Sequence, residues 1–445
     1  MPIDTRVHQQ RRAALANRIR AAGGGVAVIA TAPITARKAD VDHVFRHDSH
    51  FYYLTGFVEP KAALLMQVEG ARTTTTLFCR PSNPAREVWE GKRLGVDAAP
   101  AALAVDAALD IDGLENAVVD ALRQRDTLFA VLGRAQSIEP KLLDWLKRAG
   151  ATSRDPRRDA GRLLDIAAWI DEARQIKDAH EIALMQRAAD ISSQAHVDAM
   201  MATAPGKREY EIEAELLYTF RRLGAQHHAY PSVVASGANA CTLHYSANDG
   251  LLGPHDLLLI DAGCEFDGYA ADITRTYPVS GRFSAGQQAL YETVLAAQLA
   301  AIEATRAGTR FDVPHEAAVR VLAQGLLDHG LLEGSLDGTL ESGSWKRFYL
   351  HRTGHWLGMD VHDVGPYRDE AGEWCALAPG MVVTVEPGLY VPAAADVDAR
   401  FHDIGIRIED DVVVTDRDAT VLTSGVPKDV ASIERLVGSR RRAAA

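Results

Sequence analysis

Four strand-like runs in the C-terminal half of the chain each carry an acidic residue among apolar neighbours. The runs are rich in Val, Leu and Ile and lie near residues 256–263, 269–278, 381–386 and 403–414. Burying one unpaired carboxylate costs on the order of several kcal/mol. A converging set of four therefore requires compensating positive charge, which constrains the fold more than any other feature of the chain.

The dipeptide Asp267-Gly268 predicts a two-residue β-hairpin between the first two runs. Such a turn places Asp261 opposite Thr274. The same register places Gly263 opposite Asp272. Because side chains alternate along a strand, Asp261 and Asp272 are expected on one face, about 7–8 Å apart as diagonal neighbours. Two bare carboxylates in this position would repel each other, which indicates a shared ion or ion pair.

The other two runs add acids in the same alternating pattern. Glu386 comes at the end of a strand that Pro387 stops, and Glu409 shares a strand face with Arg407. A lone carboxylate is ordinarily a solvated group or part of a surface salt bridge. Four together indicate two divalent cations, with His355 as the imidazole ligand. Such a ligand set favours manganese, with cobalt, zinc, iron or magnesium as alternatives.

Helical patterns surround these runs. Asp178 and Glu181 predict a capping box at the start of a long amphipathic helix. A second helix is expected from about Glu209 to Leu223, ended by Gly224, with more helix between Ala285 and His329. Strands bracketed by helices predict an α+β unit, an antiparallel sheet with helices packed on one side.

The N-terminal part alternates short apolar runs with Ala-rich helical stretches, which is typical of a mixed α/β domain. Its expected strands are residues 26–30, 63–68, 75–79 and 128–132. The Arg-rich first twenty residues predict a surface helix, with a mitochondrial transit peptide as the alternative. We expect two domains, residues 1–172 and residues 173–445.

Composition narrows the class of protein. The chain has 48 basic and 60 acidic residues, a net charge of −12, which argues against nucleic acid and anionic membranes as partners. No segment approaches membrane-spanning length. The four cysteines are far apart and form no CxxC pair, so we expect reduced thiols in a cytoplasmic protein.

Several segments resemble the bacterial Xaa-Pro aminopeptidases (aminopeptidase P), metallopeptidases of the pita-bread fold. In the C-terminal half they are residues 259–263, 271–276, 354–363, 385–388 and 405–411, and in the N-terminal half residues 51–57 and 88–95. The resemblance implies a curved antiparallel sheet with helices on its outer face. It also implies removal of the residue before a second-position proline by a hydroxide that bridges two metal ions.

The resemblance assigns a role to each ligand position. Asp261 and Asp272 would bind one metal, and Asp272 would also bridge to the other. His355 and Glu386 would complete the coordination of the second metal, and Glu409 would bridge. Every position holds the expected residue type, which argues against a metal-free member of the fold.

Further residues match positions where the family keeps groups that contact substrate or handle protons, namely His244, His351, His362 and Arg407. For each histidine, a hydrogen-bonded structural role is the alternative. Glu386 is expected to shuttle the proton, and His362 or His244 to stabilise the oxyanion.

Proline lacks an N–H and has a fixed φ, so a shallow apolar wall suits it better than a pocket that grips an amide. The resemblance implies that Tyr230 and the histidines line this wall. Trp89 and Asp40 would approach from the N-terminal domain of a neighbouring subunit, so that a homo-oligomer, a dimer or tetramer, completes the site. For Trp89, a core or domain-interface position is the alternative.

The chain departs from the family at two positions. Arg352 stands where glycine is frequent and is expected to affect the loop around the substrate carbonyl. His50 stands where an acidic residue is usual and is expected to affect a subunit contact. Neither is a ligand position.

Two other functions remain open. A prolidase would perform the same chemistry on dipeptides alone, and would need a cationic group to hold the free proline carboxylate. A peptide-binding homologue would keep the fold without catalysis. A methionine aminopeptidase is disfavoured because it would not need so large an N-terminal domain.

Overall fold

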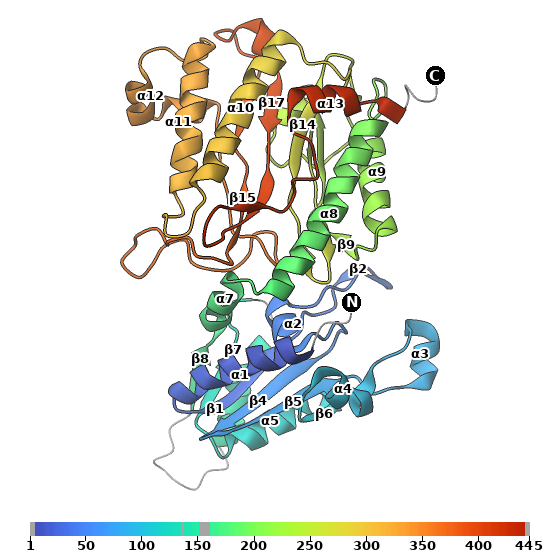
Figure 1. Ribbon diagram of the computed structural model, residues 1–445. Coiled ribbons are helices and arrows are strands. Elements are labelled where there is room, and N and C mark those ends of the chain that lie inside the picture. Colours follow the sequence, from blue (N-terminus) through green and yellow to red (C-terminus); the bar gives the residue numbers. More distant parts are fainter. Residues whose placement is uncertain (1–4, 135–137, 151–160, 441–445) are drawn as a thin grey trace. The chain divides into compact units, whose positions relative to one another are not determined.

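The computed structural model describes residues 5–134, 138–150 and 161–440. The chain forms two compact units, Met1–Ala173 and Arg174–Ala445 (Figure 1). Among the described residues, no helix is long and apolar enough to cross a membrane.

The N-terminal unit is built on one six-stranded mixed sheet, in the order β6-β5-β4-β1-β7-β8. Its strands are β1 (Gly25–Ala30), β4 (Ala63–Glu69), β5 (Arg72–Cys79), β6 (Ala107–Asp110), β7 (Thr127–Ala130) and β8 (Arg162–Asp165), with a separate pair β2 (Ala36–Lys38) and β3 (Val41–Asp42). Its helices are α1 (Thr5–Ala21), α2 (Ser49–Thr55), α3 (Pro84–Glu90), α4 (Gly95–Leu103), α5 (Leu114–Leu122) and α6 (Leu142–Gly150), and α7 (Ala167–Gln175) crosses the unit boundary. The predicted mixed α/β class is confirmed.

The prediction of a surface helix at the N-terminus is only half right. Arg12 of α1 is buried and donates hydrogen bonds to the carbonyl oxygens of Leu54, at 2.8 Å, and Ala104, at 2.6 Å. A buried guanidinium is stable there because backbone carbonyls at the ends of two other helices, α2 and α4, accept its protons.

The helices of the C-terminal unit are α8 (Ala179–Ala202), α9 (Glu209–Arg222), α10 (Ala285–Ala304), α11 (Val313–Asp328), α12 (Leu336–Ser342) and α13 (Val430–Leu436). The predicted capping box is present, since Asp178 accepts from the Glu181 N–H and Glu181 accepts from the Asp178 N–H. Gly224 has a φ of 100° just beyond α9. The stretch predicted between Ala285 and His329 is two helices, packed against each other.

The strands of this unit pair only in antiparallel ladders across the residues described. They are β9 (His227–His228), β10 (Val233–Ser236), β11 (Leu257–Asp261), β12 (Cys264–Phe266), β13 (Tyr269–Ala270), β14 (Thr274–Pro278), β15 (Val382–Val385), β16 (Gly388–Val391), β17 (Ile404–Arg407), β18 (Asp410–Val413) and β19 (Thr420–Val421). Helix α10 packs against β15, β16 and β17, and α8 packs against β12 and β13, on the near side of the strands in Figure 1. The predicted α+β arrangement is confirmed.

The hairpin register agrees with the prediction. Asp261 pairs with Thr274, and Asp267 and Gly268 have φ values of 47° and 80°, as a two-residue turn of this kind requires. A Cβ on Gly263 would lie 1.7 Å from the carbonyl oxygen of Ala271, so only glycine fits where the strands approach. Two of the four predicted runs, residues 269–278 and 403–414, are nevertheless each divided into two short strands, whereas the other two runs hold one strand each.

Candidate metal centre

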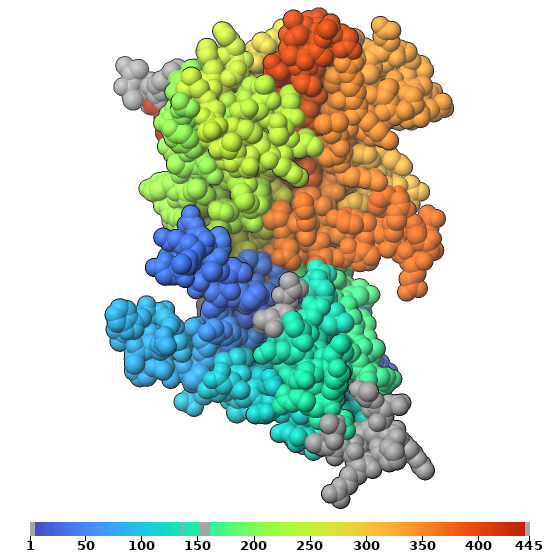
Figure 2. Space-filling view, turned by 180° about the vertical axis from the view of Figure 1, so that it is seen from behind, coloured from blue at the N-terminus to red at the C-terminus, as the bar shows by residue number. Residues whose placement is uncertain are grey.

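The four predicted acidic ligands lie at the ends of strands or between two strands. Asp261 is the last residue of β11, Asp272 lies between β13 and β14, Glu386 follows β15, and Glu409 lies between β17 and β18. The backbone at the breaks is still held: Glu386 N donates to the Thr353 carbonyl at 2.7 Å, and Glu409 N to the Thr274 carbonyl at 3.0 Å. Strands on both sides thus fix each acid while the break lets its side chain turn toward the others. Figure 2 shows the face of the unit opposite to that in Figure 1, where segments near residue 240 (yellow-green) and near residue 370 (orange) border each other.

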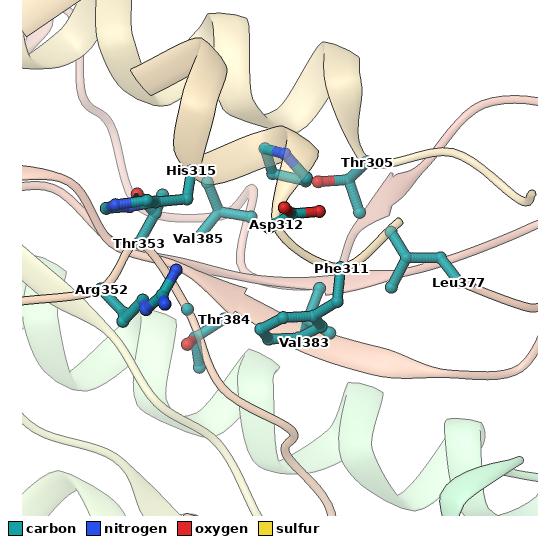
Figure 3. A pocket seen from close by; sticks show the side chains of 12 residues that line it. Thr305, Phe311, Asp312, His315, Arg352, Thr353, Leu377, Val383, Thr384 and Val385 are labelled. Atoms are coloured by element: carbon teal, nitrogen blue, oxygen red, sulfur yellow. Dashed lines mark hydrogen bonds between the residues drawn. The ribbon is translucent and has the colours of Figure 1, made fainter. Parts of the chain in front are cut away.

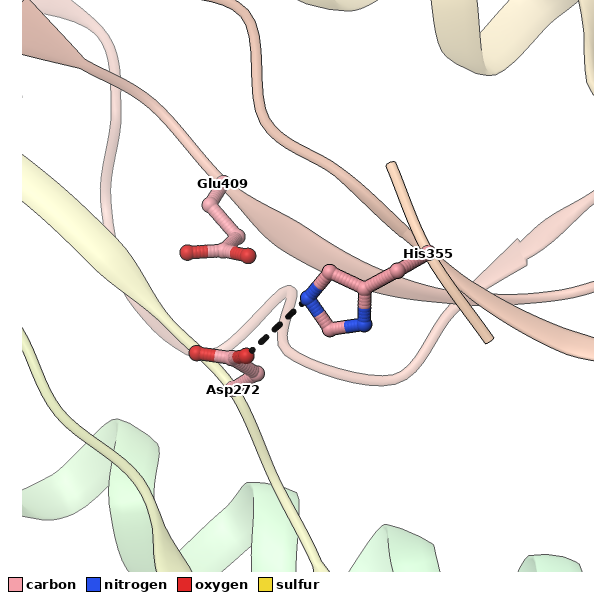
Figure 4. A group of neighbouring side chains, drawn as sticks. All are labelled: Asp272, His355 and Glu409. Carbon is pink, nitrogen blue, oxygen red and sulfur yellow. Dashed lines mark ion pairs between the residues drawn. The ribbon is translucent and has the colours of Figure 1, made fainter. Parts of the chain in front are cut away.

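The structure brings all five predicted ligands together. Ligand atoms of Asp272, His355 and Glu409 lie within 4.8 Å of one another (Figure 4). The Nε2 atom of His355 is 3.5 Å from Asp272 Oδ2 and 3.6 Å from Glu386 Oε1. Asp261 joins the group through the Tyr230 hydroxyl, which is 2.6 Å from Asp261 Oδ1 and also contacts Asp272 Oδ1.

The His355 ring is oriented for ligation. Its Nδ1 lies 3.0 Å from the Trp356 carbonyl oxygen and donates to it, so that the Nε2 lone pair faces the carboxylates. A backbone acceptor on the far nitrogen is typical of a metal-binding imidazole. The preceding Gly354 runs so close to β15 that a Cβ would lie 2.1 Å from the Thr384 carbonyl oxygen.

Arg407 is the fixed positive charge of the centre. It is 4% exposed, and its Nη2 donates to Asp261 Oδ2 at 2.6 Å. Its Nε donates to the Thr274 hydroxyl at 3.0 Å, and that hydroxyl donates to Glu409 Oε2 at 2.6 Å. Its Nη1 donates to the Tyr390 hydroxyl at 2.8 Å. Each of its three nitrogens therefore donates to a ligand residue or to a residue that supports the centre.

The centre holds more buried carboxylates than cations, and the pKa values of three of these carboxylates are raised as a result. Burial raises the pKa of Glu386 to about 7, and burial with the nearby charge of Asp272 raises that of Glu409 well above its ordinary value. Burial also raises the pKa of Asp261. For Asp272, burial is outweighed by the hydrogen bond and charge of His355, so its pKa is lowered. The donor set, four carboxylates and one imidazole with Arg407 as the permanent cation beside them, fits divalent cations.

Three histidines surround the centre. Nδ1 of His351 is 3.7 Å from Glu386 Oε2, and its Nε2 is 2.8 Å from the Tyr390 hydroxyl. Burial lowers the pKa of His351 to about 3, so its ring is neutral. The exposed His362 ring lies edge-on to His355 with 4.4 Å between centroids. Exposed His244 is near enough for its charge to contribute to the lowered pKa of His351 and His362.

The other predicted site residues lie in different surroundings. The Tyr230 hydroxyl points at two ligands, which assigns it a structural task that the resemblance did not suggest. Trp89 is 86% exposed on α3, so the alternative of a core position is wrong, and Asp40 is also exposed. His50 is buried in its own unit, with Nε2 2.8 Å from Asp171 Oδ1.

Sequence reasoning missed several supporting residues. The Asp272 N–H donates to both oxygens of Asp411, at 3.2 and 3.1 Å, and Asp411 is buried with its pKa raised well above its ordinary value by burial and by Asp272. Thr274 and Tyr390, described above, support Glu409 and Arg407. A second acid two positions after Glu409 was the available signal for Asp411, whereas nothing local marked the Tyr390 hydroxyl.

Comparison with known proteins gives consistent matches over the whole chain. Residues 183–416 match the model of metallopeptidase family M24, and residues 8–129 match the aminopeptidase P N-terminal domain. The chain is 42% identical to the Xaa-Pro aminopeptidase of Haemophilus influenzae, over 90% of each chain, and 38% identical to that of Escherichia coli, over 98% of each.

Solved structures agree. Aminopeptidase PepP of Pseudomonas aeruginosa superimposes with a TM-score of 0.94 at 43% identity, covering 100% of both chains. A variant of Escherichia coli aminopeptidase P in complex with substrate gives a TM-score of 0.93 at 36% identity, covering 99% of this chain and 100% of that one.

Proposed function

Because the chain belongs to metallopeptidase family M24 and carries an aminopeptidase P N-terminal domain, we propose that it is an Xaa-Pro aminopeptidase. It removes the N-terminal residue from peptides with proline in the second position. The observation that carries this proposal is the convergence of Asp272, His355 and Glu409 within 4.8 Å, in a chain 42% identical to an Xaa-Pro aminopeptidase.

In this proposal the five converging residues would hold two divalent ions, with manganese as the expected metal. Asp261 and Asp272 would hold one ion, His355 and Glu386 would hold the other, and Asp272 and Glu409 would contribute to both sites. When bound, such ions lower the pKa of coordinated water so that it attacks a carbonyl carbon near neutral pH.

The remaining steps depend on side chains of this chain. Glu386 accepts and returns a proton, since its carboxylate lies beside both His355 and His351. His362, whose ring lies against His355, and the exposed His244 donate to the oxygen of the substrate carbonyl as it gains charge. Arg407 keeps Asp261 oriented. The hydrogen bond to Tyr390 fixes the neutral ring of His351 beside Glu386.

Recognition of proline uses a wall that includes the Tyr230 ring and the histidines. We further propose that Trp89 and Asp40 reach the site of a neighbouring subunit in a homo-oligomer, a dimer or tetramer, in the cytoplasm. Its support is that Trp89 is 86% exposed on a helix with no buried residue. An aromatic side chain left in water in this way is typical of a residue that binds a partner.

The test is release of the N-terminal residue from Gly-Pro-Ala and Gly-Pro after chelation, with and without added manganese. Metal-restored cleavage of the tripeptide supports the proposal. Cleavage of the dipeptide alone would make the protein a prolidase, and failure with both peptides would favour the peptide-binding homologue.

A further inference from the structure

Arg352 is a cation beside the metal centre whose guanidinium has no anionic partner. Its side chain is exposed, and its guanidinium carbon lies 4.7 Å from the centroid of the Trp374 ring. Within the part of the chain that the structure describes, no oxygen accepts a hydrogen bond from this guanidinium. Arg407, the other arginine at the centre, donates a hydrogen bond from each of its three nitrogens, to Asp261, Thr274 and Tyr390.

The backbone of Arg352 is tied to the catalytic groups. The Nδ1 atom of His351 donates to the Arg352 carbonyl at 2.7 Å, and the same atom is 3.7 Å from Glu386 Oε2. Figure 3 shows the Arg352 side chain at one edge of a small pocket, near Thr353 and Thr384. The Arg352 backbone therefore lies at the rim of the centre, on the side of Glu386, and its side chain extends from there to Trp374.

A cluster of aromatic rings lies between the backbone of Trp356 and the ring of Trp374. The N–H of Trp356, the residue after His355, donates to the Tyr367 hydroxyl at 3.3 Å. Tyr367 and Trp374 both pack against Phe311, with ring centroids 4.8 and 6.1 Å apart. Trp374 is partly exposed, so a bound peptide that extends past Glu386 toward this ring would meet the guanidinium of Arg352.

Support of Trp374 does not require Arg352. The Arg368 guanidinium lies 3.9 Å from the same ring and donates to the Gly372 carbonyl at 2.6 Å, within its own hairpin. Arg352 thus has a fixed place, a stacking partner and unused donors, which is the arrangement that binds a carboxylate with two parallel hydrogen bonds.

We propose that Arg352 binds a carboxylate of the peptide on the C-terminal side of the proline. The carboxylate is the chain terminus of a short peptide or an acidic side chain at the third position. This inference rests on the proposed aminopeptidase function. It makes short or acidic peptides the preferred substrates of this chain.

The experiment compares kcat/KM for Gly-Pro-Ala, its C-terminal amide, and Gly-Pro-Glu amide, using the manganese-loaded full chain. For the unsubstituted protein we expect amidation of Gly-Pro-Ala to lower kcat/KM about three- to tenfold, the effect of one rim ion pair. In Arg352→Gln the amide and the acid should be cleaved equally. Arg352→Lys, which keeps the charge but loses the planar fork, should give an intermediate penalty.

Arg368→Gln is the matched control, because it removes the other guanidinium on Trp374 and should keep the full penalty. Recovery of kcat/KM with Gly-Pro-Glu amide would identify the side chain as a second source of the carboxylate, and no recovery would restrict it to the chain terminus. An equal penalty in Arg352→Gln and the unsubstituted protein would overturn the inference. Failure of the unsubstituted protein to cleave any of the peptides would instead contradict the proposed function.

Discussion

Glu409 and Asp410 are neighbours in the sequence and are both buried, but their surroundings balance their charges in opposite ways. Asp410 accepts hydrogen bonds from Arg275 Nη2 at 2.7 Å, Lys428 Nζ at 2.6 Å, Gln298 Nε2 at 2.7 Å and the Thr423 hydroxyl at 2.8 Å. Burial alone would raise the pKa of Asp410, but the charges of Arg275 and Lys428 lower it. Glu409 has one hydroxyl donor, Thr274, and faces other carboxylates.

The contrast separates a structural ion cluster from a functional one. A buried carboxylate that is fully satisfied by donors and cations of its own chain stabilises one arrangement of strands. A buried group of carboxylates without enough internal cations is stable only when protonated or when it binds a cation. The charges around Asp410 are therefore balanced by the chain itself. The carboxylates around Glu409 instead require a bound cation.

The largest expected effect follows from removing an acid of the unbalanced cluster. Glu386→Ala should lower kcat by about 10²- to 10⁴-fold, the usual contribution of a positioned acid or base. It should also weaken metal retention and leave the melting temperature of the chelated protein unchanged or higher, since an unpaired buried carboxylate is lost. Kinetics at saturating manganese, metal analysis and thermal unfolding measure the three quantities. Unchanged turnover would remove Glu386 from the mechanism.

The balanced cluster should respond with stability rather than activity. Asp410→Asn leaves Arg275 and Lys428 facing a neutral group, and should lower the free energy of unfolding by about 3–5 kcal/mol. Urea unfolding measures this change. The matched control is Asp396→Asn, which breaks the exposed pair with Arg347 and should leave the unfolding midpoint almost unchanged. Equal unfolding midpoints for both variants would show that the Asp410 cluster contributes no more to stability than an exposed ion pair.

Manganese should stabilise the protein through the cluster that contains Glu409. This stabilisation should not depend on the cluster around Asp410. Manganese at about 100 times its dissociation constant should raise the free energy of unfolding by about 2.7 kcal/mol. The increment should persist in Asp410→Asn and shrink in Glu409→Gln, which removes a bridging ligand. Thermal unfolding with and without metal gives both increments, and an unaltered increment in Glu409→Gln would show that this residue does not bind the ion.

The smallest effect is a slope of stability with pH in the chelated protein. The folded pKa of Glu386, raised to about 7, lies above its ordinary unfolded value of about 4.3, so its contribution is present below pH 4.3 and is lost as pH rises through 7. His355, raised to about 9, continues the loss above pH 6.5. The slope should be at most about 1.4 kcal/mol per pH unit for each proton. Glu386→Gln should flatten its lower part; a slope of opposite sign would refute the account.

Local signals were sufficient for much of the fold and for the ligand positions. The cap at Asp178, the turn at Asp267-Gly268 and the alternation up to Glu386 all act within a few residues, so a sequence reading captures them. The same holds for β1 and β4, whose apolar runs are long. The short β6 and β8, with half-buried or exposed residues, carry no comparable pattern.

Contacts between distant segments were not predictable. Asp410 is bound by residues 13 to 135 positions away, and the Tyr230 hydroxyl reaches Asp261 and Asp272 across 31 and 42 positions. Such partners are chosen by tertiary packing, and a lone Arg275 or Tyr230 has the same local pattern as a surface residue. The splitting of the runs at residues 269–278 and 403–414 also follows from packing, because the ladders end where the acids turn toward one another.

The hairpin at Asp267-Gly268 has a consequence for how such a chain can change over generations. Asp261 and Asp272 face the same way only while the count of residues between them is kept, because a shift of one position in the register turns a side chain to the opposite face. Single insertions or deletions in this turn would abolish the centre without disturbing the core. Variation in length is free to accumulate elsewhere, for example in the exposed turn at Asp369–Gly372, so the turn at Asp267-Gly268 is among the places where the gene is least able to drift in length.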